Sequence, residues 1–152
     1  MNPVRSASVA LVAGGSLLLS GCVGPATTDA AYSGKAVHAT DAAESAVQTA
    51  VLTTNLLLRG RIFGSYADVV LSTVEQDVSS VQNSFDSIQP PDDAVSDKLR
   101  NGVDALLTSG ASDLTDLRIA ARRGDTKQMG SLLAELRKLA PKLDSFSKEH
   151  GG

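Results

Sequence analysis

Apolar residues recur at steps of three and four positions in four separate stretches of the chain. This spacing places them on one face of an amphipathic helix. We therefore predict helices over residues 35–59, 65–88 and 92–123, and a last helix that begins after Asp125. Gly60 and Gly124 mark two of the helix ends, because glycine readily adopts the left-handed conformation of a C-terminal cap.

The second predicted helix, residues 65–88, is rich in valine, which by itself also favours β-strands. Its apolar stripe keeps the helical spacing and consists of Val70, Val74, Val78, Val81, Phe85 and Ile88. Over a segment of this length the periodicity is the stronger signal. Ser65 followed by Asp68 is similar to a capping arrangement at the start of the helix. Pro90 and Pro91 predict its end.

The last predicted helix carries a heptad seam made of Met129, Leu132, Leu136, Leu139, Leu143 and Phe146. Asp125 and Gln128 have the spacing of a capping box at its start. Pro141 conflicts with the seam, because proline removes one backbone hydrogen bond of the helix. We therefore expect a kink or a split near Lys138.

Short connections between the four segments predict antiparallel neighbours, so the expected fold is all-α, an up-down four-helix bundle over residues 35–150. In the third helix one apolar face is predicted, from Val95 through Leu106 to Ala121. Several other apolar residues lie off or beside the main stripes and would mark a second helix-binding surface or an oligomer interface if they are exposed. They are Leu52, Leu56, Leu107, Ile119 and Leu133. Ile62 and Phe63 are either a lid over the core or an exposed contact.

The N-terminus has a different pattern: Arg5 precedes an apolar run over residues 7–19, and small residues follow. A basic start, an apolar centre and small residues before a cut site are typical of an export signal. The run is shorter than the roughly 20 apolar residues that a spanning helix needs. Residues 1–21 are therefore predicted as a signal peptide.

Leu19-Ser20-Gly21-Cys22 resembles a bacterial lipobox, and the rest of the chain contains no other cysteine. The resemblance implies cleavage before Cys22, diacylglycerol on its sulfur and an acyl chain such as palmitate on the freed amine. Residues 22–34 then form the lipidated cysteine and a flexible tether, because they contain Gly24, Pro25 and Gly34. The Gly-Ala-rich signal is also similar to those of small uncharacterised lipoproteins of high-GC Gram-positive bacteria. The alternative is a soluble secreted protein in which Cys22 is a free thiol.

Charge and composition exclude some functions of the mature chain. Removal of residues 1–21 takes away Arg5 and changes the formal charge from −3 to −4. A mildly acidic chain argues against a nucleic-acid partner, which would require a strongly basic face. Aromatic residues make up only 3% of the chain and tryptophan is absent, which argues against a carbohydrate-binding platform.

Up-down topology would place the ends of the first and third helices at one pole of the bundle, together with their basic residues. These are Arg59, Arg61, Arg118, Arg122 and Arg123. Arginines beside helix N-termini could bind an anion, a phosphate or an acidic partner. The alternative is that they only offset the helix dipoles, with Asp68 and Asp125 neutralising part of the charge.

The opposite pole would collect histidines and acids, namely His38, Asp41, Glu44, Asp92, Asp93, Glu149 and His150. Such residues can hold a divalent metal, but the Glu-x-x-His pairs of di-iron bundles are missing. Acids at helix starts are explained by the dipole. We expect no metal and no cofactor at this pole.

The chain has no nucleophile elbow, phosphate loop or dinucleotide fingerprint, so we expect it not to be an enzyme. The leading hypothesis is a non-catalytic binding or scaffolding module, anchored to the cell membrane by Cys22 on its extracytoplasmic face and acting on an envelope protein. The alternative is a carrier of a small ligand or metal that uses the helical bundle.

Overall fold

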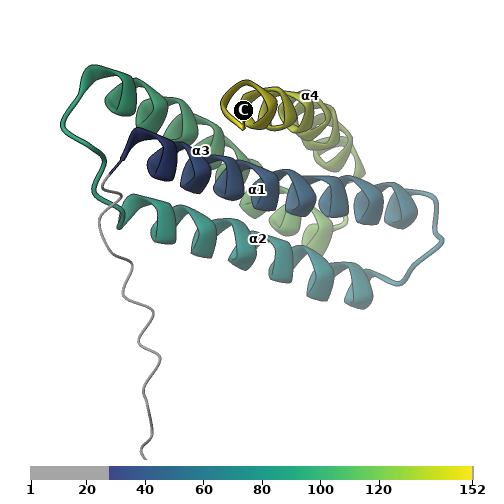
Figure 1. Ribbon diagram of the computed structural model, residues 1–152. Helices are drawn as coiled ribbons and strands as arrows, with labels where there is room; N and C mark the ends of the chain where they lie inside the picture. Colours follow the sequence, from purple (N-terminus) through teal and green to yellow (C-terminus); the bar gives the residue numbers. More distant parts are fainter. Residues whose placement is uncertain (1–27, 152) are drawn as a thin grey trace, which may run out of the picture.

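The computed structural model describes residues 28–151, and within them the chain forms four α-helices and no strand. The helices are α1 (Asp29–Leu58), α2 (Gly64–Asp86), α3 (Ala94–Arg123) and α4 (Thr126–His150). They run up and down in sequence order and pack as a bundle, which confirms the predicted fold (Figure 1). No helix among the described residues is long and apolar enough to cross a membrane. The predicted signal peptide, Cys22 and the first part of the tether lie outside these residues.

Helices α1 and α3 form the central diagonal of the bundle: within the described residues each contacts all three other helices, whereas the backbones of α2 and α4 make no close approach. The contacts of α1 depend on its composition. Its inner face consists mainly of small side chains, and these are buried: Ala36, Ala39, Thr40, Ala43, Ala46, Val47 and Ala50. The distance between packed helices depends on the side chains at the contact. Small residues therefore allow α1 to approach the diagonal helix α3 as well as its two neighbours.

Larger side chains from the other helices fill the rest of the core. The completely buried ones include Leu71, Val78, Val103, Leu107, Leu114, Leu117 and Leu136. At the end of the bundle where α1 begins, Tyr32 packs on Phe85 with ring centroids 5.5 Å apart. All of these residues lie within the described bundle, so residues 28–151 contain a complete core.

The first helix starts earlier than the sequence pattern predicts. Residues 29–34 were assigned to the tether, but they form the first turns of α1 behind an N-cap made by Thr28, whose hydroxyl oxygen accepts from the amide of Ala31 at 3.2 Å. Tyr32 is completely buried and Ser33 donates to the carbonyl of His150 at 2.8 Å. These tertiary contacts hold a segment whose own composition favours a loop.

The apolar face of α3 agrees with the predicted stripe in its middle part and differs from it at several positions. Val95, a predicted core position in the first turn, is 73% exposed, and Leu107, predicted to lie beside the stripe, is completely buried. Leu133 of α4 is also buried, whereas Leu52 is 61% exposed, as an off-stripe residue should be. Helix α3 contacts three helices, α1, α2 and α4, so its buried face is wide enough to include Leu107.

Pro141 does not split the last helix, which continues from Thr126 to His150. The proline leaves the carbonyl of Arg137 without its helical amide partner. Both residues are exposed, so this carbonyl faces solvent and the core seam is not interrupted.

We expect Pro141→Ala to raise the free energy of unfolding by about 1 to 3 kcal/mol, because alanine restores the backbone bond and removes the ring clash. Urea denaturation of the chain from Val23 onward measures the change. The matched control is Lys142→Ala, a substitution at the next exposed position, with an expected change below about 0.5 kcal/mol. Equal stabilities of Pro141→Ala and the parent chain would contradict the assignment of an intact helix through this position.

Candidate functional site at the distal end of the bundle

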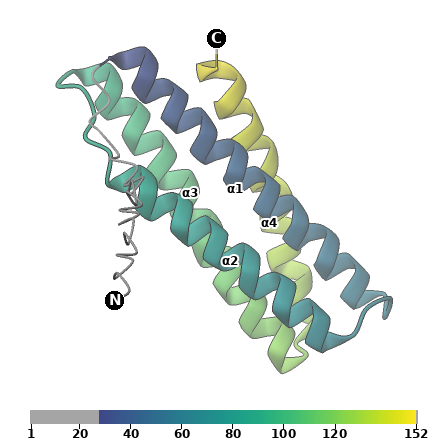
Figure 2. The same ribbon diagram turned by 60° about the horizontal axis from the view of Figure 1, so that its bottom comes forward.

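The turn between α1 and α2 and the turn between α3 and α4 lie at the same end of the bundle, which we call the distal end because it is opposite the start of α1 (Figure 2). Gly60 and Gly124 have φ angles of 64° and 66°, as predicted for C-terminal caps. In the first turn Arg61 N–H bonds to Leu56 O, and in the second Asp125 N–H bonds to Ala120 O. Both are Schellman turns, so the backbone at this end is well defined.

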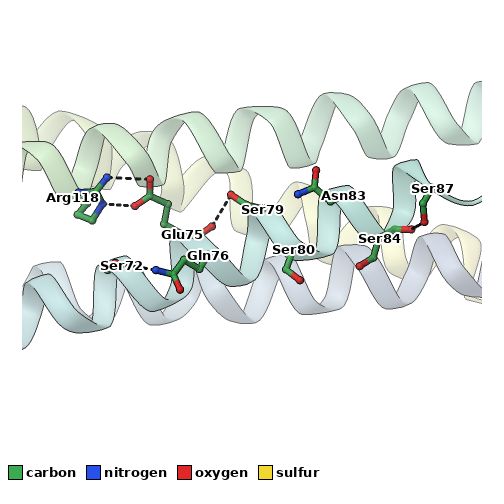
Figure 3. A pocket seen from close by; sticks show the side chains of 9 residues that line it. All are labelled: Ser72, Glu75, Gln76, Ser79, Ser80, Asn83, Ser84, Ser87 and Arg118. Atoms are coloured by element: carbon green, nitrogen blue, oxygen red, sulfur yellow. Dashed lines mark hydrogen bonds and ion pairs between the residues drawn. The ribbon is translucent and has the colours of Figure 1, made fainter. Parts of the chain in front are cut away.

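The structure divides the five predicted arginines into two groups. Arg118 and Arg122 form ion pairs with carboxylates of the neighbouring helix α2. Arg118 binds Glu75 through two nitrogens (Figure 3). Thr115 donates to the same carboxylate at 2.8 Å. Arg122 donates to the two oxygens of Asp68 at 2.5 and 3.1 Å. These two arginines connect α3 to α2.

The two carboxylates are held in their ionised form. The hydrogen bond from Arg118 lowers the pKa of Glu75, although burial opposes the effect, and the bond from Thr115 adds to it. The hydrogen bond from Arg122 lowers the pKa of Asp68, and the pKa values of both arginines are raised by their partners. Because the charges of Arg118 and Arg122 are balanced within the bundle, these residues are poor candidates for binding an external anion.

The remaining three arginines, Arg59, Arg61 and Arg123, are exposed and form no ion pair with a described residue. The first two flank Gly60 in the α1–α2 turn, and the third ends α3. They are therefore the part of the predicted cluster that keeps its charge available.

The N-terminus of α2 lies in the same region and differs from the sequence prediction. The N-cap is Phe63, without a side-chain hydrogen bond to the helix, and the first turn contains no acid. The predicted cap at Ser65 with Asp68 is therefore wrong, because Asp68 binds Arg122 instead. By contrast, Asp125 caps α4 as predicted, accepting from the amide of Gln128 at 2.9 Å. The free amides of α2 add partial positive charge to the distal end.

Exposed apolar side chains accompany these charges. Phe63 is 85% exposed, Tyr66 60% and Leu58 38%, so Phe63 is a surface contact rather than a lid. We call the set of Arg59, Arg61, Arg123, Leu58, Phe63 and Tyr66 the distal surface. Sequence reasoning missed Tyr66, because its position four residues before Val70 continues the predicted apolar stripe of α2 and gives no signal of exposure.

A shallow groove of about 800 Å³ runs between α2 and α3 from the Arg118–Glu75 pair toward the other end of the bundle (Figure 3). Apart from that pair, its lining is uncharged and polar: Ser72, Gln76, Ser79, Ser80, Asn83, Ser84 and Ser87. Several of these groups bind within α2, since Ser79 donates to the carbonyl of Glu75 and Ser87 to that of Ser84. The groove therefore presents solvated hydroxyl and amide groups and few strong recognition elements.

Several of the histidines and acids of the opposite pole have separate local partners. Asp93 caps α3, Asp41 accepts from Ser147, and His150 packs on Phe146 with centroids 4.5 Å apart. In the part of the chain that the structure describes, no three histidine, cysteine or acidic side chains come together as metal ligands. Cys22 lies outside that part.

Comparison of the chain with protein-family models, with curated proteins and with solved structures found no match. The geometry and the sequence pattern are therefore the basis for the proposals that follow.

We expect Glu75→Gln to lower the free energy of unfolding by about 1 to 2 kcal/mol at pH 7, because it breaks a partly buried ion pair. The pKa of Glu75 is lowered in the folded chain, so this stabilisation is present above the unfolded pKa and disappears as the pH falls through the folded one. Urea denaturation between pH 7 and pH 3 measures whether the free energies of unfolding of the parent chain and of Glu75→Gln become equal as the pH falls. Asp68→Asn, at a more exposed pair, is the control and should cost less. A difference that stays constant down to pH 3 would contradict the ion-pair explanation.

Proposed function

We propose that the chain is a lipoprotein, held by acylated Cys22 at the extracytoplasmic face of the cell membrane, and that its bundle is a non-catalytic binding module. The observation that carries the proposal is the distal surface, where arginines that pair with no described acid lie beside exposed aromatic residues. Large exposed apolar side chains together with free charges are typical of protein interaction sites.

The position of this surface fits an anchored module. The chain enters the bundle at Asp29, a short distance after Cys22, and α1 then runs for 30 residues to the distal end. At roughly 1.5 Å per residue, the helix is about 45 Å long. An anchor at Cys22 would therefore leave the distal surface facing away from the lipid and toward other envelope components.

The chemistry of the distal surface selects a partner with carboxylate or phosphate groups next to an apolar patch. Arginine forms paired hydrogen bonds with planar carboxylates, and Phe63 and Tyr66 can anchor in a pocket of the partner. An acidic envelope protein fits this description best.

The alternative, a carrier that uses the interior of the bundle, has less support. The inward positions of the four helices are filled by leucine, valine and alanine side chains that are almost completely buried. A metal-carrying version would need a group of ligands, and the described residues contain no such cluster.

We expect wild-type chain to separate with the membrane fraction and to incorporate labelled palmitate, since two or three acyl chains hold a protein stably on a bilayer. Cys22→Ala should lose the label and leave the membrane fraction. Cys22→Ser, which keeps the size of the side chain, should behave in the same way. If either variant retains the label, the lipid is attached to another residue, and the proposed anchor at Cys22 is wrong.

We expect the triple change of Arg59, Arg61 and Arg123 to glutamine to abolish partner capture by crosslinking in intact membranes, because it removes the free positive charge of the distal surface. The matched control changes Lys138, Lys142 and Lys148 of α4 to glutamine, with the same loss of charge on another face. Phe63→Ser should also reduce capture, by roughly tenfold or more if it is a contact anchor. If the arginine variant captures the partner as well as the lysine control does, the distal surface is not the binding site.

A further inference from the structure

A second hollow lies at the opposite, proximal end of the bundle, between the first turns of α1 and α3 and the last turns of α4. Figure 2 shows these three helix ends together near the C-terminus. The pocket has a volume of about 510 Å³, which is within the range of pockets that bind small molecules. Its apolar lining includes Leu99 and Phe146 on the inner side and Val95 at the rim.

Gly102 shapes the inner wall of this proximal pocket. A Cβ atom at this position would lie 2.9 Å from Cε2 of Phe146, which is too close for a real contact. Because glycine has no side chain, the Phe146 ring can lie against α3 and expose part of itself to the hollow. Val95, at the rim, is 73% exposed, although the sequence pattern predicts a core position.

Contacts within the chain hold the walls of the pocket in place. Ser33 of α1 donates to the carbonyl of His150 at the end of α4, at 2.8 Å, and the His150 ring packs on Phe146. Asp93 caps α3 by accepting from the amides of Val95 and Ser96 at 2.8 and 2.9 Å. A preformed pocket loses little conformational freedom when it binds.

The mouth of the pocket has an excess of negative charge. Asp29 and Glu149 contribute carboxylates, and Lys98 contributes one positive charge. Nearby, the second oxygen of Asp93, Oδ2, is buried and has no hydrogen-bond partner among the described residues. Hydrogen bonds from Ser96 lower the pKa of Asp93, so this carboxyl group is ionised. The first turns of α1 and α3 add partial positive charge, which Asp29 and the capping Asp93 offset. With Glu149 and the C-terminal end of α4 the balance stays negative, which favours a positively charged group.

We propose that the proximal pocket binds an amphiphile that has an apolar chain and a protonated amine head. The apolar chain lies against Leu99 and Phe146, and the amine lies between the carboxylates of Asp29 and Glu149. This site is separate from the distal surface, so it extends the proposed function and does not depend on partner capture.

The test uses the chain from Val23 onward, which contains the complete bundle and lacks Cys22. Calorimetric titration with dodecylamine below its micellar concentration should give saturable binding with one molecule per chain. Dodecanoic acid, which has the same apolar chain and a negative head, should bind at least tenfold more weakly. No saturable binding of the amine, or equal binding of the acid, would overturn the proposal.

Two variants at neighbouring exposed positions locate the site. Ala30 lines the pocket and Ala31 does not, although both are exposed in the first turn of α1. Ala30→Trp should fill the pocket and weaken dodecylamine binding at least tenfold, whereas Ala31→Trp should leave it unchanged. Binding that survives in Ala30→Trp would place the amine elsewhere.

A charge variant separates the head group from the apolar chain. Glu149→Gln should weaken dodecylamine binding severalfold and leave the binding of dodecanol, an uncharged analogue, unchanged. Since Glu149 is exposed, the substitution should not disturb folding. If Glu149→Gln weakens the binding of dodecylamine and dodecanol equally, the Glu149 carboxylate does not bind the amine.

Discussion

A row of alanines on the inner face of α1 allows this helix to pack closely against all three others, and the arrangement of both bundle ends follows from that contact. Ala36, Ala43 and Ala50 are each at most 2% exposed. Small side chains at a helix contact reduce the distance between the axes. Helix α3 consequently contacts α1 across the diagonal, whereas α2 and α4 remain apart throughout the described residues. Volume added to this face would separate the helices whose ends form the distal surface and the proximal pocket.

The same arrangement decides which charges are available to a partner. Helix α2 runs antiparallel beside α3, so Glu75 and Asp68 lie next to Arg118 and Arg122 and neutralise them. Arg59, Arg61 and Arg123 lie in or next to the distal turns and pair with no acid among the described residues, and Phe63 in the first turn is exposed. The ion pairs within the bundle thus reduce the predicted cluster of five arginines to a smaller surface that combines three arginines with exposed apolar side chains.

The two ends of the bundle differ in chemical character because different helix termini meet there. The distal end combines free arginines with the uncapped N-terminus of α2. At the proximal end, the starts of α1 and α3 meet the end of α4 around a hollow with acidic residues at its mouth. With Cys22 as the anchor, the proximal end would be the one nearest the lipid, where an amphiphile is most available.

The sequence by itself determined the helical fold, the two glycine caps and the Asp125 cap, because each depends on residues a few positions apart. Only the tertiary structure decided the start of α1, where the burial of Tyr32 stabilises turns that look like a tether. It also decided the face of α3, since a helix with three neighbours buries Leu107 together with the middle of the predicted stripe, while Val95 stays exposed. The sequence also could not show which arginines are paired, because the acids that bind Arg118 and Arg122 are about 40 or more residues away in the sequence. Local periodicity specifies a helix, but the identity of its neighbours specifies which charges and hollows remain at the surface.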